Sequence, residues 1–229
     1  MKKANNETLL GQRLLTVSKY IRDGAVLCDV GTDHAKLPIY LASIGKIKKA
    51  YATDINEGPI KTAEKNVKML GYSSVIECIK TDGLENTDNL GISDVSICGM
   101  GGELIASILE ACEYIKESSV NLVLQPMTHV QDLRRYLFDA GFKIDDEVLC
   151  KETGKLYVCI CAHYVGSPVP YTELDTVLGK ILPKKEHDEL FCEMCERTLY
   201  HFINRQKSTD ASEAQTAKKL YDEIKEVLG

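Results

Sequence analysis

Acidic side chains follow three successive apolar runs in the first part of the sequence: Asp29, Asp54 and Asp82. If these runs form parallel strands, the three acids meet at the carboxyl edge of one sheet, where open α/β sheets bind their ligands. Carboxylates accept hydrogen bonds from hydroxyl and amine groups, and they repel phosphate. The pattern therefore predicts a site for a nucleoside that carries no phosphates.

Asp54 and Asp82 suit different parts of such a ligand. Asp54, with Asn56 close behind it, follows the first turn by about 20 residues, the spacing at which an acid binds a ribose. Asp82 stands next to Gly83, so its carboxylate can accept from an adenine amine while the neighbouring amide donates to a ring nitrogen. We expect all four residues to bind the cofactor. Taken singly, each acid is also typical of a helix N-cap.

Two glycine-rich turns supply the space for a ligand. Gly31 follows the first apolar run and lets the backbone approach a ligand closely. The second turn, Gly99-Met100-Gly101-Gly102, carries little side-chain bulk. The first turn lacks the GxGxxG pattern, which argues against a dinucleotide. S-adenosylmethionine (SAM) fits such a site, because its sulfonium cation favours the nearby carboxylates, Asp29 included.

The surrounding sequence alternates between strand-like and helix-like segments, which is typical of a parallel sheet wound by right-handed crossovers. Strand-like runs are expected at residues 25–30, 48–55, 73–80, 93–102 and 120–126. Helices are expected at residues 7–20, 59–70, 103–116 and 130–140. Two more strand-like runs, 142–152 and 155–165, meet at Thr153-Gly154 in a hairpin that adds an antiparallel strand at the far end. The prediction is an α/β, Rossmann-like sheet of seven strands, the last of them antiparallel.

The composition changes after residue 165. Residues 166–172, GSPVPYT, hold a glycine and two prolines, which is typical of a linker. Residues 173–229 are polar with sparse apolar positions at helical spacing, and residues 207–214 are expected to form the turn of a helical, coiled-coil-like hairpin. We therefore divide the chain into a SAM-binding domain at 1–165, N-terminal helix included, and a C-terminal helical domain at 166–229.

The composition is that of a globular protein. The 229 residues include 28 basic and 34 acidic side chains, for a net charge of -6, and 44% are hydrophobic. No apolar run approaches the roughly 18 residues that span a bilayer, and the N-terminus lacks the apolar core of a signal peptide. The acidic balance argues against a protein that coats nucleic acid, although a local basic patch stays compatible with it.

Nine cysteines lie mostly in apolar strand-like runs, as expected for reduced core thiols of a cytoplasmic protein. Cys192 and Cys195 form one CxxC pair. His187 and His201 flank this pair at spacings that match no zinc finger, so we expect no metal.

Four strings make the resemblance to a known family specific. They are DVGTDHAKLP at 29–38, ICGMGGELI at 97–105, LVLQP at 122–126 and LRRYLFDAGFKIDDE at 133–147. With them the chain resembles, over nearly its whole length, the bacterial tRNA (adenine-22-N1)-methyltransferases, a TrmK-like family within the class I SAM-dependent methyltransferases. The resemblance implies a class I sheet, SAM as cofactor, tRNA as partner and methyl transfer to N1 of adenine 22. One departure is Met127, where we expect asparagine after Gln-Pro.

The resemblance also implies that Asp33 is catalytic, with His34 orienting it or touching the cofactor. A carboxylate there stabilises a purine that becomes positively charged as its N1 is methylated. The alternative is that Asp33 only caps a helix starting at Ala35. Gln125 and Pro126, at the end of the fifth strand-like run, are expected to line the base site, because a glutamine amide can both donate to and accept from an adenine edge.

An RNA partner requires local cations on this acidic chain. Arg13 and Arg134, each within a small basic cluster, are the expected RNA contacts, and charge reversal at either should weaken RNA binding. Each cluster alone is also typical of a solvated face. Two other functions stay open: a SAM-dependent enzyme that acts on a small molecule or a protein, and a non-catalytic module whose helical hairpin recruits a partner.

Overall fold

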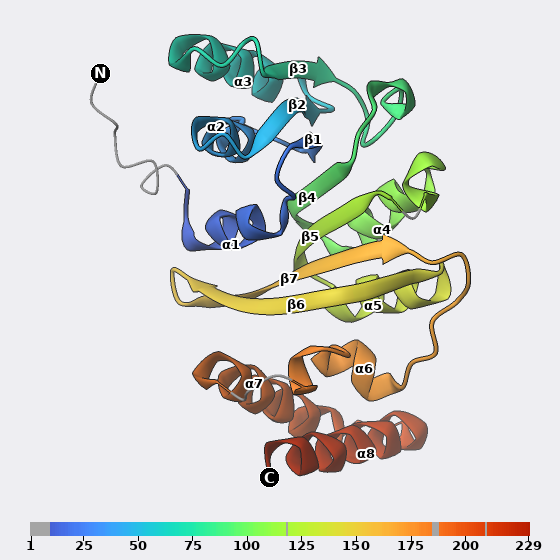
Figure 1. Cartoon of the computed structure of the whole chain (residues 1–229). Coiled ribbons are helices and arrows are strands. Elements are labelled where there is room, and N and C mark those ends of the chain that lie inside the picture. The colour runs from blue at the N-terminus through green and yellow to red at the C-terminus, as the bar shows by residue number, and fades with distance from the viewer. Residues whose placement is uncertain (1–9, 118, 185–187, 209) are drawn as a thin grey trace.

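One seven-stranded sheet organises the computed structural model, which describes residues 10–117, 119–184, 188–208 and 210–229. The strand order is β3-β2-β1-β4-β5-β7-β6 (Figure 1). The strands are β1 (Ala25–Val30), β2 (Ile47–Asp54), β3 (Ile76–Lys80), β4 (Asp94–Gly101), β5 (Asn121–Thr128), β6 (Phe142–Glu152) and β7 (Lys155–Tyr164). Strands β1 to β5 pair in parallel, and β7 is antiparallel to both of its neighbours. The predicted seven-strand sheet with an antiparallel last strand is confirmed.

Helices cover both faces of this sheet. The helices that precede β6 are α1 (Gln12–Tyr20), α2 (Lys36–Ser43), α3 (Glu57–Leu70), α4 (Gly102–Glu110) and α5 (Val130–Asp139). Because side chains alternate along a strand, Leu27 and Val123 join the apolar cluster under α1 to α3, whereas Cys28 and Leu124 join the cluster under α4 and α5. A parallel sheet that is covered on both faces leaves its carboxyl edge for a ligand.

The closing hairpin turns where the sequence predicts it. Thr153 and Gly154 both adopt positive φ, of 47° and 77°, as a tight two-residue hairpin turn requires. The antiparallel strand β7 lies between β5 and β6, one place in from the edge at which we expected it. Cys159 and Ile160 of β7 are fully buried, one in each apolar cluster, while β6 exposes charged residues such as Lys143. The more polar strand therefore takes the edge.

Two helical segments differ from the expected bounds. Helix α4 ends at Glu110, and the chain then forms the short 3-10 turn η3 (Tyr114–Lys116), where the sequence predicted a helix to residue 116. Tertiary contacts account for this break, because Ile115 is fully buried and the Tyr114 hydroxyl lies 2.9 Å from Thr87 Oγ1, just before the 3-10 turn η2 (Asp88–Leu90). The expected helix at 7–20 is described from Gln12 onward, and residues 7–9 lie outside the described part.

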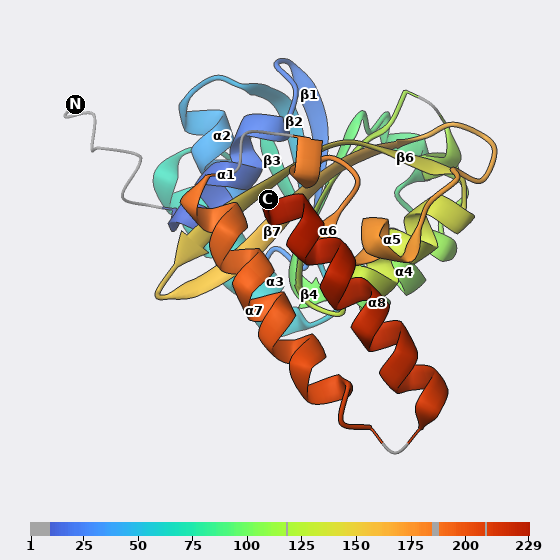
Figure 2. The same ribbon diagram turned by 90° about the horizontal axis from the view of Figure 1, so that it is seen from below.

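The C-terminal region is helical, as predicted. It contains α6 (Glu173–Leu178), the 3-10 turn η4 (Leu182–Lys184), α7 (Glu189–Arg205) and α8 (Ala211–Leu228). Helices α7 and α8 pack side by side as a hairpin, which Figure 2 shows from below. The sequence did not predict α6, whose start is fixed by a capping box between Thr172 and Asp175.

The helical hairpin shares the core of the sheet. Phe191, Cys195 and Phe202 of α7, with Leu220 and Ile224 of α8, belong to the same buried cluster as α4, α5 and their face of the sheet. A domain boundary at residue 165 stays a prediction, and apolar packing is continuous across it. Among the described residues, no helix has the length and apolar character that crossing a membrane requires.

Candidate active site

The turn after β1 is organised by a buried carboxylate. Asp29 is 5% exposed and accepts hydrogen bonds from Thr32 Oγ1 at 2.7 Å and from Ser96 Oγ at 2.6 Å. The parallel register places Ser96 of β4 directly beside Asp29. Burial raises the pKa of Asp29, and the two hydroxyl donors partly offset that rise. Asp29 therefore ties β1, its turn and β4 together at the floor of the site, and nothing in the sequence pattern marks Thr32 and Ser96 as its partners.

Gly31 provides a cradle that a side chain would fill. Its φ is +69°, and a Cβ built there would overlap the methyl carbon Cε of Met100. Gly99 also has a positive φ, of +81°. Both glycines line a cavity of about 270 Å³ together with Asp29 and Asp33. The first and fourth strands thus meet at a hollow with open backbone and acidic walls, which fits a cationic ligand such as SAM.

Asp33 and His34 lie on the wall of this cavity. Asp33 adopts φ +53°, a left-handed conformation that Asp tolerates better than most residues. Its side chain is 68% exposed, and its Oδ2 lies 3.2 Å from His34 Nε2. Helix α2 begins at Lys36 with Ala35 as its N-cap and no side-chain cap. The alternative in which Asp33 caps this helix is therefore wrong, and its carboxylate is available to a ligand.

The acids after β2 and β3 stand at the same edge of the sheet. Asp54 Oδ1 accepts from the backbone N–H of Asn56 at 2.7 Å, so the loop folds around this carboxylate. Asp82 and Gly83 line a second cavity of about 270 Å³. A Cβ on Gly83 would lie 3.1 Å from Ile108 of α4, which marks an apolar wall beside the acid. Ribose and adenine contacts at these residues stay predictions.

The glycines at the end of β4 do not share one role. Gly101 and Gly102 face the end of β5, where a Cβ on Gly102 would overlap the backbone carbonyl oxygen of His129. Gly102 is therefore needed for close packing of two backbones, because α4 and α5 begin side by side. Its expected place in the cofactor site stays a prediction, while Gly99 lines the Asp33 cavity.

The expected base-contacting residues are buried. Gln125 is 0% exposed, and Pro126 is buried as well. The Gln125 side-chain carbonyl accepts a hydrogen bond from Arg13 Nη1, and its amide donates to Pro126 O at 2.8 Å. Direct contact of Gln125 with a substrate base is therefore a prediction that the structure corrects. Its amide instead holds Arg13 at the cavity wall.

Arg13 of α1 contacts residues of β5, β6 and β7 beside the Asp33 cavity. It lines the cavity that contains Asp33, and its guanidinium lies 6.0 Å from the ring centre of Tyr157. Its backbone N–H donates to Glu152 Oε1 at 3.2 Å, so α1 is fastened to the tip of the hairpin. The sequence offers no short-range signal for Glu152 or Tyr157, because both lie far along the chain from Arg13.

Arg134 is a structural residue. Only 2% of it is exposed, its Nε donates to Glu147 Oε1 at 2.7 Å, and its Nη1 donates to the carbonyls of Thr176 and Val177. The expectation that Arg134 contacts RNA is wrong, because its guanidinium is buried and bonds groups inside the protein. The sequence does not show which of these two adjacent arginines is buried. Both stand in a polar helix, and Arg135, the next residue, is 38% exposed.

The described residues do not assemble a metal site around the CxxC pair. All nine cysteines are free thiols, and burial raises the pKa of Cys195 to about 11. His187 lies outside the described part of the chain. Glu103, His129 and Asp132 do bring potential ligand atoms together, but all three are exposed and pair with one another.

A substitution at Gly31 tests the cradle. We expect Gly31→Ala to weaken SAM binding by about tenfold, because the new methyl group enters the space that Met100 and the ligand share. Isothermal calorimetry with SAM measures the change. Gly45→Ala is the matched control, since Gly45 has φ +70° and no atom near its Cβ position. Equal SAM affinity in the two variants would show that Gly31 does not line the cofactor site.

Solved structures match the chain over almost its full length. Sp1610 of Streptococcus pneumoniae, in complex with S-adenosyl-L-methionine, is 35% identical with a TM-score of 0.83, and the match covers 95% of this chain and 98% of that one. M. capricolum TrmK, in complex with S-adenosyl-homocysteine, is 28% identical with a TM-score of 0.79, and the match covers 96% of both chains. The helical hairpin is therefore part of the shared architecture.

The strand order and the acids along its carboxyl edge define a class I methyltransferase domain, and the methyltransferase domain family matches residues 10–160. The tRNA (adenine(22)-N(1))-methyltransferase of Bacillus subtilis (strain 168) is 34% identical over 220 residues, covering 94% of this chain and 92% of that protein. The chain belongs to the TrmK-like family of bacterial tRNA (adenine-22-N1)-methyltransferases.

Proposed function

We propose that this protein transfers the methyl group of SAM to N1 of adenine 22 in tRNA. The observation that carries the proposal is the identity of 34% over 220 residues to the Bacillus subtilis tRNA (adenine(22)-N(1))-methyltransferase. The turn that holds Asp29, Gly31 and Asp33 supports it, because an acid-lined cavity with open backbone suits a cationic cofactor.

When bound, SAM would supply an electrophilic methyl group: the lone pair of adenine N1 forms the new N–C bond in line as the C–S bond breaks, S-adenosyl-homocysteine leaves as a neutral thioether, and the positive charge passes to the purine. The N1 lone pair is available without deprotonation, so the protein has no need of a strong base. Its residues must instead align the two reactants and stabilise the charge that develops on the base.

Asp33 is the residue that we assign to this stabilisation. Its exposed carboxylate faces the cavity, where it can accept a hydrogen bond from the exocyclic amine of adenine as the ring becomes positive. The neighbouring His34 ring, 3.2 Å away, holds the carboxylate toward the cavity. Asp54 and Asn56 are assigned to the ribose of the cofactor, and Asp82 with Gly83 to its adenine.

The acceptor base must reach this cavity unpaired, because N1 lies on the Watson–Crick edge of adenine. Arg13 lies at the wall of this cavity and is 20% exposed. We assign it to the RNA backbone, since a partly exposed guanidinium that is held by Gln125 is pre-positioned for phosphate. A cytoplasmic location follows from this substrate.

Mass spectrometry of tRNA nucleosides tests the function. Incubation of unmodified tRNA transcripts with the protein and SAM should yield N1-methyladenosine at position 22, and an adenine-to-guanine change at that position should abolish it. A panel of metabolites and proteins, assayed with radiolabelled SAM, covers the alternative substrate classes. Methylation of a panel member and not of tRNA would contradict the proposal. Failure to bind SAM in calorimetry would instead favour a non-catalytic module.

A further inference from the structure

Met127 is an exposed apolar side chain at the carboxyl edge of the sheet. It stands near the end of β5, directly after Gln125 and Pro126, and is 41% exposed. It is also the position at which the chain departs from the asparagine that the family resemblance implies. A large apolar side chain gains free energy when a ligand removes it from water. Met127 could therefore bind a substrate group that an asparagine would bind differently.

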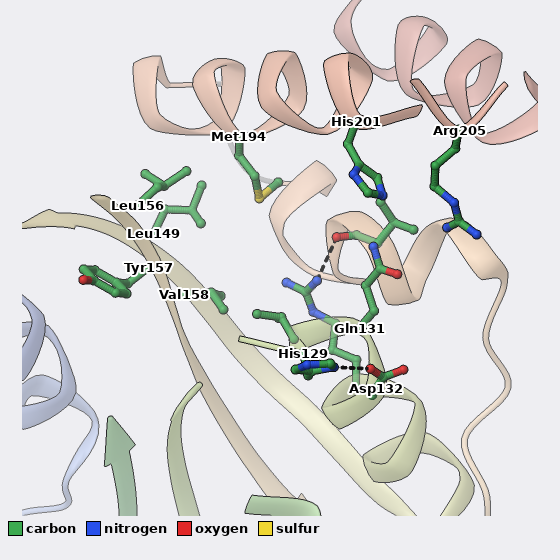
Figure 3. Close-up of a pocket in the computed structure, with 13 residues that line it drawn as sticks. His129, Gln131, Asp132, Leu149, Leu156, Tyr157, Val158, Met194, His201 and Arg205 are labelled. Atoms are coloured by element: carbon green, nitrogen blue, oxygen red, sulfur yellow. Dashed lines mark hydrogen bonds and ion pairs between the residues drawn. The ribbon is translucent and has the colours of Figure 1, made fainter. Parts of the chain in front are cut away.

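The side chain of Met127 lies on the face of the sheet that carries α1. Residues two apart along a strand point to the same face, and Gln125 bonds Arg13 of α1. The Sδ atom of Met127 lies 3.9 Å from Nε2 of Gln125, as expected for neighbours on one face. The Tyr157 ring belongs to this face too, because it points away from Met194 (Figure 3) and its centre lies 6.0 Å from the Arg13 guanidinium.

This face of β5 adjoins the Asp33 cavity. Cys98 and Gly99 of β4 line the cavity, and the parallel register pairs Cys98 with Gln125. Met127 comes two residues after Gln125, in the direction of the carboxyl edge, where the cavity opens. Its side chain therefore stands beside the mouth of the cavity that is assigned to the methyl transfer.

We propose that Met127 is the platform for the target adenine, with its thioether against one face of the ring while the edge of the ring meets Asp33. The inference rests on the proposed function and adds a residue that holds the base. A base that is flipped out of an RNA stack loses its stacking neighbours. A thioether is soft and polarizable and contacts an aromatic ring favourably. It also carries no charge that would oppose the purine as it becomes positive.

The thioether gives this contact a different chemistry from that of an amide. An asparagine can donate to and accept from the edge of a base, whereas methionine offers an apolar surface to its face. Met127 thus adds affinity for the flipped base, and the choice of adenine stays with the carboxylate of Asp33, which accepts from the exocyclic amine.

Two tRNA transcripts isolate the contact: one carries adenine at position 22, and the other carries an abasic nucleotide there. Fluorescence anisotropy in the presence of S-adenosyl-homocysteine gives the Kd for each. We expect Met127→Ala to raise the Kd for the adenine transcript by about fivefold, because a sulfur–aromatic contact is lost. The Kd for the abasic transcript should stay unchanged, since the contact is made to the base alone, and this value also shows that the variant is folded.

Two further variants serve as controls. Met127→Leu should keep most of the affinity for the adenine transcript, since leucine retains an apolar side chain of similar volume. Met69→Ala is the matched control, because Met69 is 69% exposed and stands at the last turn of α3 (Glu57–Leu70), outside the Asp33 cavity. It should leave both Kd values unchanged.

Two results in Met127→Ala would overturn the inference: an equal loss of affinity for both transcripts, which would make Met127 a structural residue, or an unchanged Kd for both. Either result is read beside nucleoside analysis of the unaltered protein. If that protein forms N1-methyladenosine at position 22, only the role of Met127 fails. If it forms none, the proposed function fails as well.

Discussion

Replacing Asp33 with asparagine is expected to lower kcat for methyl transfer to tRNA by about a hundredfold to a thousandfold. Asparagine keeps the size of the side chain and tolerates the left-handed backbone that this position adopts, with φ +53°. It removes only the negative charge that faces the cavity. That negative charge stabilises the positive charge that develops on adenine. Its loss therefore raises the energy of the transition state more than that of the bound reactants. Single-turnover kinetics with saturating tRNA and SAM measure the effect.

Cofactor affinity separates a catalytic Asp33 from a cofactor-binding one. Calorimetry with SAM should give a Kd for Asp33→Asn that rises far less than kcat falls, because the substitution removes one charge from the cavity wall but keeps the cofactor contacts assigned to Asp54 and Asp82. His34→Ala is the companion variant. It should lower kcat by less than Asp33→Asn does, because it removes a ring that positions the carboxylate from 3.2 Å away but leaves the negative charge of Asp33 in place. Unchanged turnover in Asp33→Asn would refute the catalytic assignment, and a raised SAM Kd with normal kcat would make Asp33 a cofactor residue.

Local sequence patterns predicted the carboxyl edge of the sheet well. Asp29, Asp54 and Asp82 each stand at or just after the end of a strand, because short apolar runs with an acid behind them leave few other arrangements in a parallel sheet. The hairpin at Thr153-Gly154 was equally predictable, since the positive φ of both residues is a local requirement of the turn.

Long-range burial was not predictable in the same way. Gln125 and Arg134 have residue types that usually face solvent, and both are buried because partners from distant segments satisfy them. Gln125 is held by Arg13, which precedes it by 112 residues, and Arg134 by carbonyls 42 and 43 residues further along. Periodicity and short motifs do not reveal pairings between such distant residues. The contacts of Arg13, Gln125 and Arg134 could therefore be identified only from the structure.

The burial of Arg134 leads to the second large expected effect. Arg134→Met should lower the free energy of unfolding by about 3–5 kcal/mol, because Glu147, itself 0% exposed, is left as a buried charge without its guanidinium. The carbonyls of Thr176 and Val177 lose their donor as well, so the contact between α5 and α6 is weakened. Urea denaturation followed by circular dichroism gives the change in free energy.

Arg135→Met is the matched control for this prediction. Arg135 is the next residue along the same helix and also binds α6, through Glu173 at 2.9 Å, yet 38% of its side chain is exposed. Its loss should therefore cost at most about 1 kcal/mol, because solvent screens the pair. The double variant Arg134→Met/Glu147→Leu should recover part of the loss, since it removes the buried carboxylate that has lost its guanidinium, whereas the carbonyls of Thr176 and Val177 still lack their donor. Equal losses in Arg134→Met and Arg135→Met would mean that the Arg134–Glu147 pair behaves as a surface contact and does not fasten α5 to β6 and α6.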